Sequence, residues 1–135
     1  MRLHPQIFDL DSEQERVCWA LWSAVFVYIP TDFKTKLCMG YGFVNLTDGK
    51  NVQHFIEVFD GYSEWCHSSS SKVCKAIQSQ TQGLAANIER YRNSPVMSDE
   101  VPESFKPALF VGGKQVPFPE PTKELPRIQH RFQRQ

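Results

Sequence analysis

The residues of this sequence best suited to chemistry are two aromatic rings in the segment Met39–Leu46. Side chains alternate between the two faces of a β-strand, so a strand here places Tyr41, Phe43 and Asn45 on one face. Two exposed rings on one face can stack on unpaired nucleic-acid bases, at about 1–3 kcal/mol per base. Glycines before and between the rings keep bulk away from them, while the apolar residues on the other face can pack against helices.

The same octamer fits a known pattern, the third strand of an RNA recognition motif (RRM): basic, Gly, aromatic, Gly or Ala, aromatic, Val, any residue, aromatic. The five inner positions, from Gly40 to Val44, all match. The two ends do not, because Met39 replaces a basic residue and Leu46 replaces an aromatic one. From the octamer alone, two interpretations stay open: an RNA-binding strand, or a strand with ordinary packed aromatics.

The surrounding chain supplies the elements that must position these rings. Ser12–Glu15 is a capping box ahead of an apolar run, which indicates a helix start. Apolar residues at spacings of three and four after Asn51 indicate a second helix. The expected elements are a helix at 13–24, strands at 25–29 and 37–46, a helix at 51–59, a short strand at 72–79 and a helix at 83–92. This order predicts an α+β fold.

Two strand-forming stretches resemble a particular family. Phe26–Lys34 and Gly40–Asn45 are similar to the second and third strands of the Mei-two-like RRM, the C-terminal RRM of the meiosis regulators of that name. Phe59–Gly61 with Trp65 resembles the end of its second helix and the loop beyond, and Gln82–Met97 resembles its extra helix.

The resemblance covers about residues 26–97 and implies a ferredoxin-like RRM sandwich, an antiparallel sheet with two helices on one face, plus an extra C-terminal helix. It also implies single-stranded RNA binding without catalysis. The expected organisation is a divergent N-terminal segment with a helix at 1–24, an RRM-like domain at 25–97 that includes the extra helix at 83–93, and an extended Pro-rich tail at 98–135. A small hairpin at 109–116 around Gly112-Gly113 fits within that tail.

The resemblance does not include a clear first strand. Ile7–Leu10 is the stretch that could serve, with Phe8 in the aromatic place but Asp9 where an apolar residue is expected. Either the first strand is divergent and short, or residues 1–24 are foreign to a truncated RRM. In the second case the neighbouring strands would retain unpaired backbone groups.

The charge distribution bears on how RNA would be held. Fifteen basic and fifteen acidic residues give a formal net charge of zero, with acidic flanks, a nearly neutral centre and a basic end. Binding driven by rings should therefore depend only weakly on salt. Tyr28 shares the binding face if Val27 and Ile29 face the core, and Arg90 and Arg92 either contact phosphate or form a solvated face. The candidate RNA-binding residues are Tyr41, Phe43, Tyr28, Asn45, Lys34, Lys36, Arg90 and Arg92.

Other chemistry has weaker support in this sequence. Cys66-His67 with Cys74 lacks the paired ligands of a structural zinc site, and the histidines have no nucleophile partner at a recognisable spacing. We therefore expect no enzyme activity, no cofactor and no metal. Met1–Asp11 has no apolar core of a signal peptide, and the apolar run 17–29 is too short to span a bilayer. The expectation is an intracellular monomer, nuclear or cytoplasmic, that binds single-stranded RNA. The alternatives are a protein-interaction module on an RRM-like scaffold, or a truncated non-functional RRM.

Overall fold

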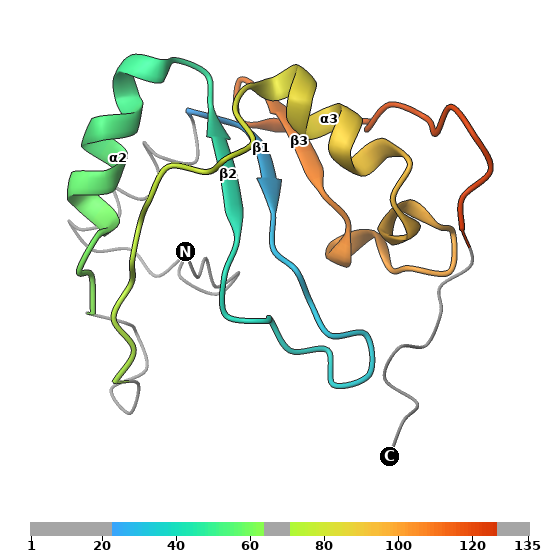
Figure 1. Cartoon of the computed structure of the whole chain (residues 1–135), viewed down its shortest axis with the longest axis horizontal. Coiled ribbons are helices and arrows are strands. Elements are labelled where there is room, and N and C mark those ends of the chain that lie inside the picture. The colour runs from blue at the N-terminus through green and yellow to red at the C-terminus, as the bar shows by residue number, and fades with distance from the viewer. Residues whose placement is uncertain (1–22, 64–70, 127–135) are drawn as a thin grey trace.

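The computed structural model describes residues 23–63 and 71–126, and within them the chain forms a four-stranded antiparallel sheet (Figure 1). The strand order is β2-β1-β3-β4. The strands are β1 (Ala24–Tyr28), β2 (Phe43–Leu46), β3 (Ala108–Val111) and β4 (Lys114–Val116). The helices are α2 (Val52–Phe59) and α3 (Leu84–Arg92), with short 3-10 turns at Gly49–Asn51, Pro95–Met97 and Glu103–Phe105. This arrangement confirms the predicted α+β class and is consistent with a ferredoxin-like RRM.

Most of the expected elements are present near their predicted bounds. The strand predicted at 25–29 is β1, and the helices predicted at 51–59 and 83–92 are α2 and α3. The predicted hairpin is β3 and β4, which join through Gly112 and Gly113 at φ of 55° and 78°. Two consecutive residues with positive φ are what a type I′ hairpin turn requires, and glycine adopts that conformation without steric cost. The candidate first strand Ile7–Leu10 lies outside the described residues, as does the helix expected at 13–24 up to residue 22, and Ala24 begins β1 instead of ending that helix.

The strand predicted at 37–46 is shorter in the structure, because β2 begins only at Phe43. The chain between the strands instead turns at Asp32, whose carboxylate accepts the backbone N–H groups of Lys34 and Thr35. Hydrogen bonds from the N–H of Thr35 and then of Lys34 lower the pKa of this carboxyl. Lys36 at φ 59° and Gly40 at φ 94° then take left-handed backbone conformations that no regular strand can include.

The segment at 72–79 lies extended but does not join the sheet, so the strand expected there differs from the structure. Cys74 and Ala76 are buried, whereas Val73 and Ile77 are exposed, which is the alternation of a strand. Its hydrogen bonds go to the turn after α2: Gly61 N–H donates to the Cys74 carbonyl, and Cys74 N–H to the Tyr62 carbonyl. A regular strand needs a ladder with a neighbouring strand, and the described residues supply none here.

The described part of the chain after residue 98, which ends at residue 126, is not the extended tail that the sequence suggests. It folds back, and β3 pairs with β1 through Phe26 opposite Leu109 and Val27 opposite Ala108. Leu109 and Val101 are buried. The sequence predicted this hairpin but not its pairing with β1, because the prolines around it interrupt every longer hydrophobic pattern.

The sheet separates two apolar clusters. Val44 and Leu46 of β2 pack with α2 against Phe55 and Phe59. The alternate residues of β1 and β2 face the other way and join a cluster around Phe26, Leu109 and Tyr91 of α3. The extra helix therefore covers the face opposite to α2.

Candidate nucleic-acid interface

The aromatic residues of β1 and β2 share one face of the sheet. Tyr28 lies opposite Phe43 in the ladder, and Phe26 lies opposite Asn45. The Tyr28 and Phe43 rings are 6.5 Å apart between centroids and almost parallel, at 12°. Val27 pairs with Val44 on the opposite face. Tyr28 therefore lies on the same face as Phe43, which is the orientation expected if Val27 faces the opposite side of the sheet.

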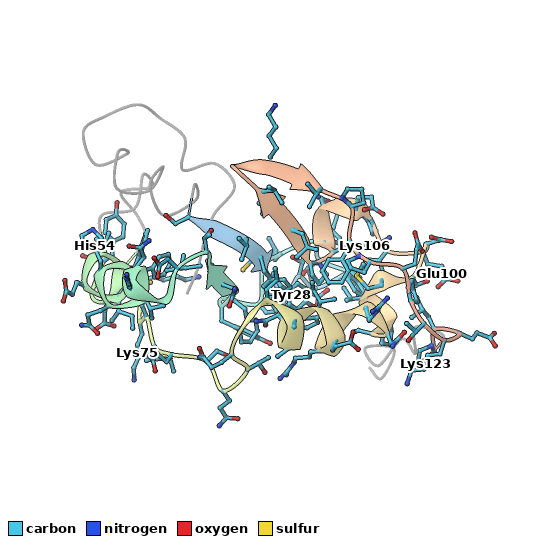
Figure 2. All side chains as sticks on the ribbon, turned by 90° about the horizontal axis from the view of Figure 1, so that it is seen from above. Tyr28, His54, Lys75, Glu100, Lys106 and Lys123 are labelled. Carbon is cyan, nitrogen blue, oxygen red and sulfur yellow. The ribbon has the colours of Figure 1, made fainter. Side chains whose placement is uncertain are left out.

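Helix α3 covers much of this face. The Tyr91 ring lies 4.7 Å from the Tyr28 ring and 5.7 Å from the Phe26 ring, measured between centroids. Figure 2 shows Tyr28 in the middle of the molecule, between the strands and α3. Its ring already has an aromatic neighbour and is not open to a base.

Tyr41 is the ring that remains accessible. Its exposed fraction is 47%, whereas Phe43 is half-buried. The two rings meet edge to face, with centroids 5.7 Å apart and planes at 86°, a favoured aromatic geometry. Phe43 thus supports Tyr41 from the covered side, and Tyr41 presents its ring at the border of α3.

Arg90 of α3 lies against the Tyr91 ring. Its guanidinium carbon is 5.6 Å from the Tyr91 ring centroid, and Nη1 donates to the Thr81 hydroxyl at 3.0 Å. Within the described ranges no carboxylate lies at ion-pair distance from Arg90. Arg90 is exposed, so the N–H donors of its guanidinium that bind neither Thr81 nor Tyr91 can reach an anion in solution.

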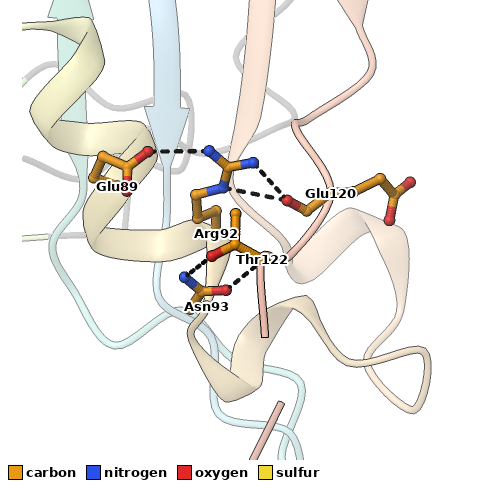
Figure 3. Close-up of polar contacts among 5 residues, drawn as sticks. All are labelled: Glu89, Arg92, Asn93, Glu120 and Thr122. Atoms are coloured by element: carbon orange, nitrogen blue, oxygen red, sulfur yellow. Dashed lines mark hydrogen bonds and ion pairs between the residues drawn. The ribbon is translucent and has the colours of Figure 1, made fainter. Parts of the chain in front are cut away.

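The contacts of Arg92 indicate a different role. Its Nη1 contacts the Glu89 carboxylate at 3.0 Å, and its Nε and Nη2 donate to the Glu120 carbonyl at 3.2 and 2.8 Å (Figure 3). Next to it, the Asn93 amide donates to the Thr122 hydroxyl, and the Thr122 N–H donates back to Asn93, both at 2.9 Å. Arg92 is thus neither a solvated charge nor an available phosphate ligand in this structure.

The remaining candidates are dispersed. Lys34 and Lys36 are exposed in the connection that leads from β1 to Tyr41. Asn45 is half-buried opposite Phe26, and its amide donates weakly to the Leu46 carbonyl at 3.4 Å. The structure thus brings Tyr41, Phe43 and Tyr28 together with Tyr91 and Arg90, and it leaves the lysines in the adjoining loop.

The segment that carries this aromatic face matches a known family. The family model for RNA recognition motif 2 matches residues 21–92, more than half of the chain. The chain belongs to this family. Protein MEI2-like 3 of Oryza sativa subsp. japonica is 35% identical over 99 residues, covering 70% of this chain and 10% of that protein. Protein terminal ear1 of Zea mays is 39% identical over 99 residues, covering 71% of this chain and 15% of that protein.

These comparisons confirm the resemblance to Mei-two-like proteins, with Protein MEI2-like 4 of Arabidopsis thaliana a further relative at 35% identity over 99 residues, covering 70% of this chain and 11% of that protein. This chain spans between a tenth and a sixth of the length of these relatives. Membership of the RNA recognition motif 2 family supports RNA binding in general, and such domains are typically not enzymes.

The RRM's covered face depends on α3 staying in place. Undocking would expose Phe26, Tyr91 and Leu109, at about 1.5–3 kcal/mol for each side chain. The two ring pairs that Tyr91 makes would be lost as well, at about 0.5–1.5 kcal/mol each. Bases stacked on the uncovered Tyr28 and Phe43 would return about 1–3 kcal/mol each. Undocking α3 would cost more free energy than the stacked bases would supply, so α3 is a layer of this RRM rather than a lid.

The sequence leaves open whether the extra helix lies across the aromatic face, and in the structure Tyr91 of α3 packs there. A usable signal was present: Leu84, Ile88 and Tyr91 form an apolar stripe that needs a partner. No pattern in the sequence indicates the hydrogen bonds from Arg92 and Asn93 to residues 120–122, because one of their acceptors is a backbone carbonyl far along the chain.

Burial changes the acidity of the tyrosines in this RRM. Desolvation, followed by the nearby Tyr91 and Tyr41 phenols, raises the pKa of Tyr28 from 10.0 to about 12. Burial also raises the pKa of Tyr91, and the positive charge of Arg90 opposes that rise.

This shift predicts alkaline destabilisation. A raised pKa in the folded state means that Tyr28 stabilises the fold fully below pH 10, its unfolded value, and loses that contribution as pH rises toward 12. Phenolate absorbance should show Tyr28 ionising later than an exposed tyrosine, and Tyr28→Phe should reduce the loss of stability between pH 10 and 12. Equal alkaline loss in both proteins would contradict the assignment to Tyr28.

The part of the chain that the structure describes contains no group of three or more His, Cys, Asp or Glu side chains suited to a metal ion. Cys66 and His67 lie outside the described residues. None of its helices has the length and hydrophobicity needed to cross a bilayer.

Proposed function

We propose that this RRM binds single-stranded RNA, without catalysis, through a base stacked on Tyr41 at the border of α3. The observation that carries the proposal is the exposed Tyr41 ring, supported edge-on by Phe43. Tyr28 acts in this proposal as the second support rather than as a stacking surface, because Tyr91 already covers its ring.

Basic residues around Tyr41 complete the proposed site. Arg90 offers N–H donors to a phosphate beside the stacked base, and Lys34 and Lys36 extend from the loop that leads into Tyr41. Asn45 lies on the same face, deeper under α3, and supports the strand. With few cations and one open ring, binding should be modest and its salt dependence shallow.

The proposal is tested by Tyr41→Ala in the full chain. Loss of one base stack should weaken binding to short fluorescein-labelled single-stranded RNA of random sequence, measured by fluorescence anisotropy. The expected loss is about 1–3 kcal/mol, or roughly fivefold to 150-fold in Kd. Tyr41→Phe keeps the ring and should keep most of the affinity.

Phe33→Ala is the matched control for this experiment. Phe33 is an aromatic residue of similar exposure, 42%, but its ring stacks on Phe105 at 6.1 Å instead of facing the Tyr41 cluster. It should leave RNA affinity nearly unchanged. If Tyr41→Ala and Phe33→Ala bind RNA as well as the unmodified chain, stacking on Tyr41 is excluded. Phe43→Ala is unsuitable as a binding test, because Phe43 packs in the cluster under α3.

A protein-interaction module is the second candidate function. Leu37 and Met39, with exposed fractions of 67% and 51%, precede Tyr41 and make this connection apolar as well as aromatic. This function predicts that Leu37→Ser weakens capture of a protein partner while RNA affinity stays unchanged. A cooperative thermal transition of the full chain would argue against the third candidate, a truncated non-functional RRM. That the chain is a monomer also stays a prediction, which sedimentation can check.

A further inference from the structure

The proline-rich segment 117–122 follows β4 and runs back to the C-terminal end of α3 (Figure 3). We call it the strap. Phe118 packs in the cluster that contains Tyr91 and Phe26. Beyond it, the Glu120 carbonyl accepts two hydrogen bonds from Arg92, and Thr122 exchanges two with Asn93. The strap is thus attached to the last residues of α3 by one apolar contact and four hydrogen bonds.

The composition of the strap suits a rigid attachment. Pro117, Pro119 and Pro121 alternate with the three residues that make these contacts. Proline fixes φ near −65°, so the segment loses little conformational entropy when it docks. Arg92 is also held on its other side by Glu89, which leaves its guanidinium little freedom to turn toward solvent.

The attached residues directly follow the pair that borders the proposed RNA site. Arg90 and Tyr91 immediately precede Arg92 and Asn93 in the last turn of α3. A shift of this turn would displace the Arg90 guanidinium, which lies over the Tyr91 ring, and lift Tyr91 from Tyr28. We infer that Arg92 and Asn93 are positioning residues, which use the strap to hold Arg90 and Tyr91 in place for RNA binding. This inference rests on the proposed function and makes the strap part of the RNA-binding unit.

The test is a double-mutant cycle in the full chain. Arg90→Gln alone should weaken binding to the random single-stranded RNA about two- to fivefold, the size of an exposed ionic contact. The clamp variant, Arg92→Ala with Asn93→Ala, should weaken it by a similar factor. In the clamp variant, adding Arg90→Gln should then have little further effect, because the guanidinium is already displaced.

A spectroscopic readout separates positioning from general loss of stability. In the clamp variant Tyr91 should no longer shield Tyr28, so the pKa of Tyr28, measured by phenolate absorbance, should fall from about 12 toward 10. Glu103→Gln is the matched control, since it removes the Lys106–Glu103 ion pair, which has the same i,i+3 spacing as the Glu89–Arg92 pair, and leaves the hydrogen bonds to the strap intact. It should retain both RNA affinity and the Tyr28 titration.

The outcomes are distinct. If Arg90→Gln costs the same factor with and without the clamp substitutions, or if the clamp variant binds RNA as well as or better than the unmodified chain, the positioning role is overturned. If the clamp variant does not fold, Thr122→Val replaces it in the same measurements and is judged by the same outcomes, because it removes only one hydrogen bond of the strap. Failure of Tyr41→Ala to weaken binding would instead overturn the proposed function, so the two failures are distinguishable.

Discussion

Replacing Phe26 by alanine is expected to lower the free energy of unfolding by about 3–5 kcal/mol, the usual cost of removing a large buried aromatic side chain. Phe26 is fully buried, with 0% exposure. It lies on β1, which pairs with both β2 and β3. Its ring stacks on Tyr91, 5.7 Å away, and its ladder partner is Leu109. A cavity here would loosen the sheet, α3 and the hairpin at once.

Urea denaturation followed by circular dichroism measures this effect. The control is again Phe33→Ala, because Phe33 is 42% exposed and contacts Phe105 on the surface. That substitution should cost no more than about 1.5 kcal/mol, the value of one aromatic pair. Similar losses for the two variants would show that Phe26 does not join β1, α3 and the hairpin as the structure indicates.

Deleting residues 98–135 is expected to abolish cooperative folding. The deletion removes β3 and β4, and with them Leu109, Val101 and the strap. Phe26 would lose its ladder partner, and Tyr91 would lose Phe118. Phe26, Tyr91, Leu109 and Val101 would all lose their burial, and four such side chains at about 1.5–3 kcal/mol each amount to about 6–12 kcal/mol. A small domain has about 5–15 kcal/mol of total stability, so little would remain.

Thermal melts of two shortened chains, one ending at Pro126 and one at Met97, test this prediction. A chain ending at Pro126 retains every contact discussed above and should melt cooperatively, like the full chain. The shorter chain ending at Met97 should show no sigmoidal transition. If it melts cooperatively near the temperature of the full chain, the domain ends at 97 as the sequence suggests, and the hairpin is an accessory.

Local sequence patterns predicted the parts of this RRM whose cause is local. The spacing of Val52, Phe55, Ile56 and Phe59 predicted α2 because a helix places those positions on one face. Gly112 and Gly113 predicted the β3–β4 turn because few other residues tolerate consecutive positive φ. Strand alternation placed Phe43 and Asn45 on one face, and the register confirms it.

Local patterns could not predict which surfaces meet. The prolines around 98–122 indicate an extended chain, since they exclude regular helix. They do not indicate that Leu109 pairs against Phe26, more than eighty residues earlier. That choice depends on which apolar face remains uncovered after β1 and β2 pair. The packing of Tyr91 on Tyr28 depends in the same way on which apolar face of the sheet remains uncovered.

For this protein, then, the sequence by itself determined the family, the α+β class and the aromatic content of one strand face, because those depend on residue type and spacing. The tertiary structure alone decided which rings stay accessible. Tyr28 and Phe43 lie under α3, and Tyr41 remains open at its border. The physical reason is that each apolar surface can pack against several others that are distant in the sequence. Which of them become buried together depends on the whole chain and not on any one segment.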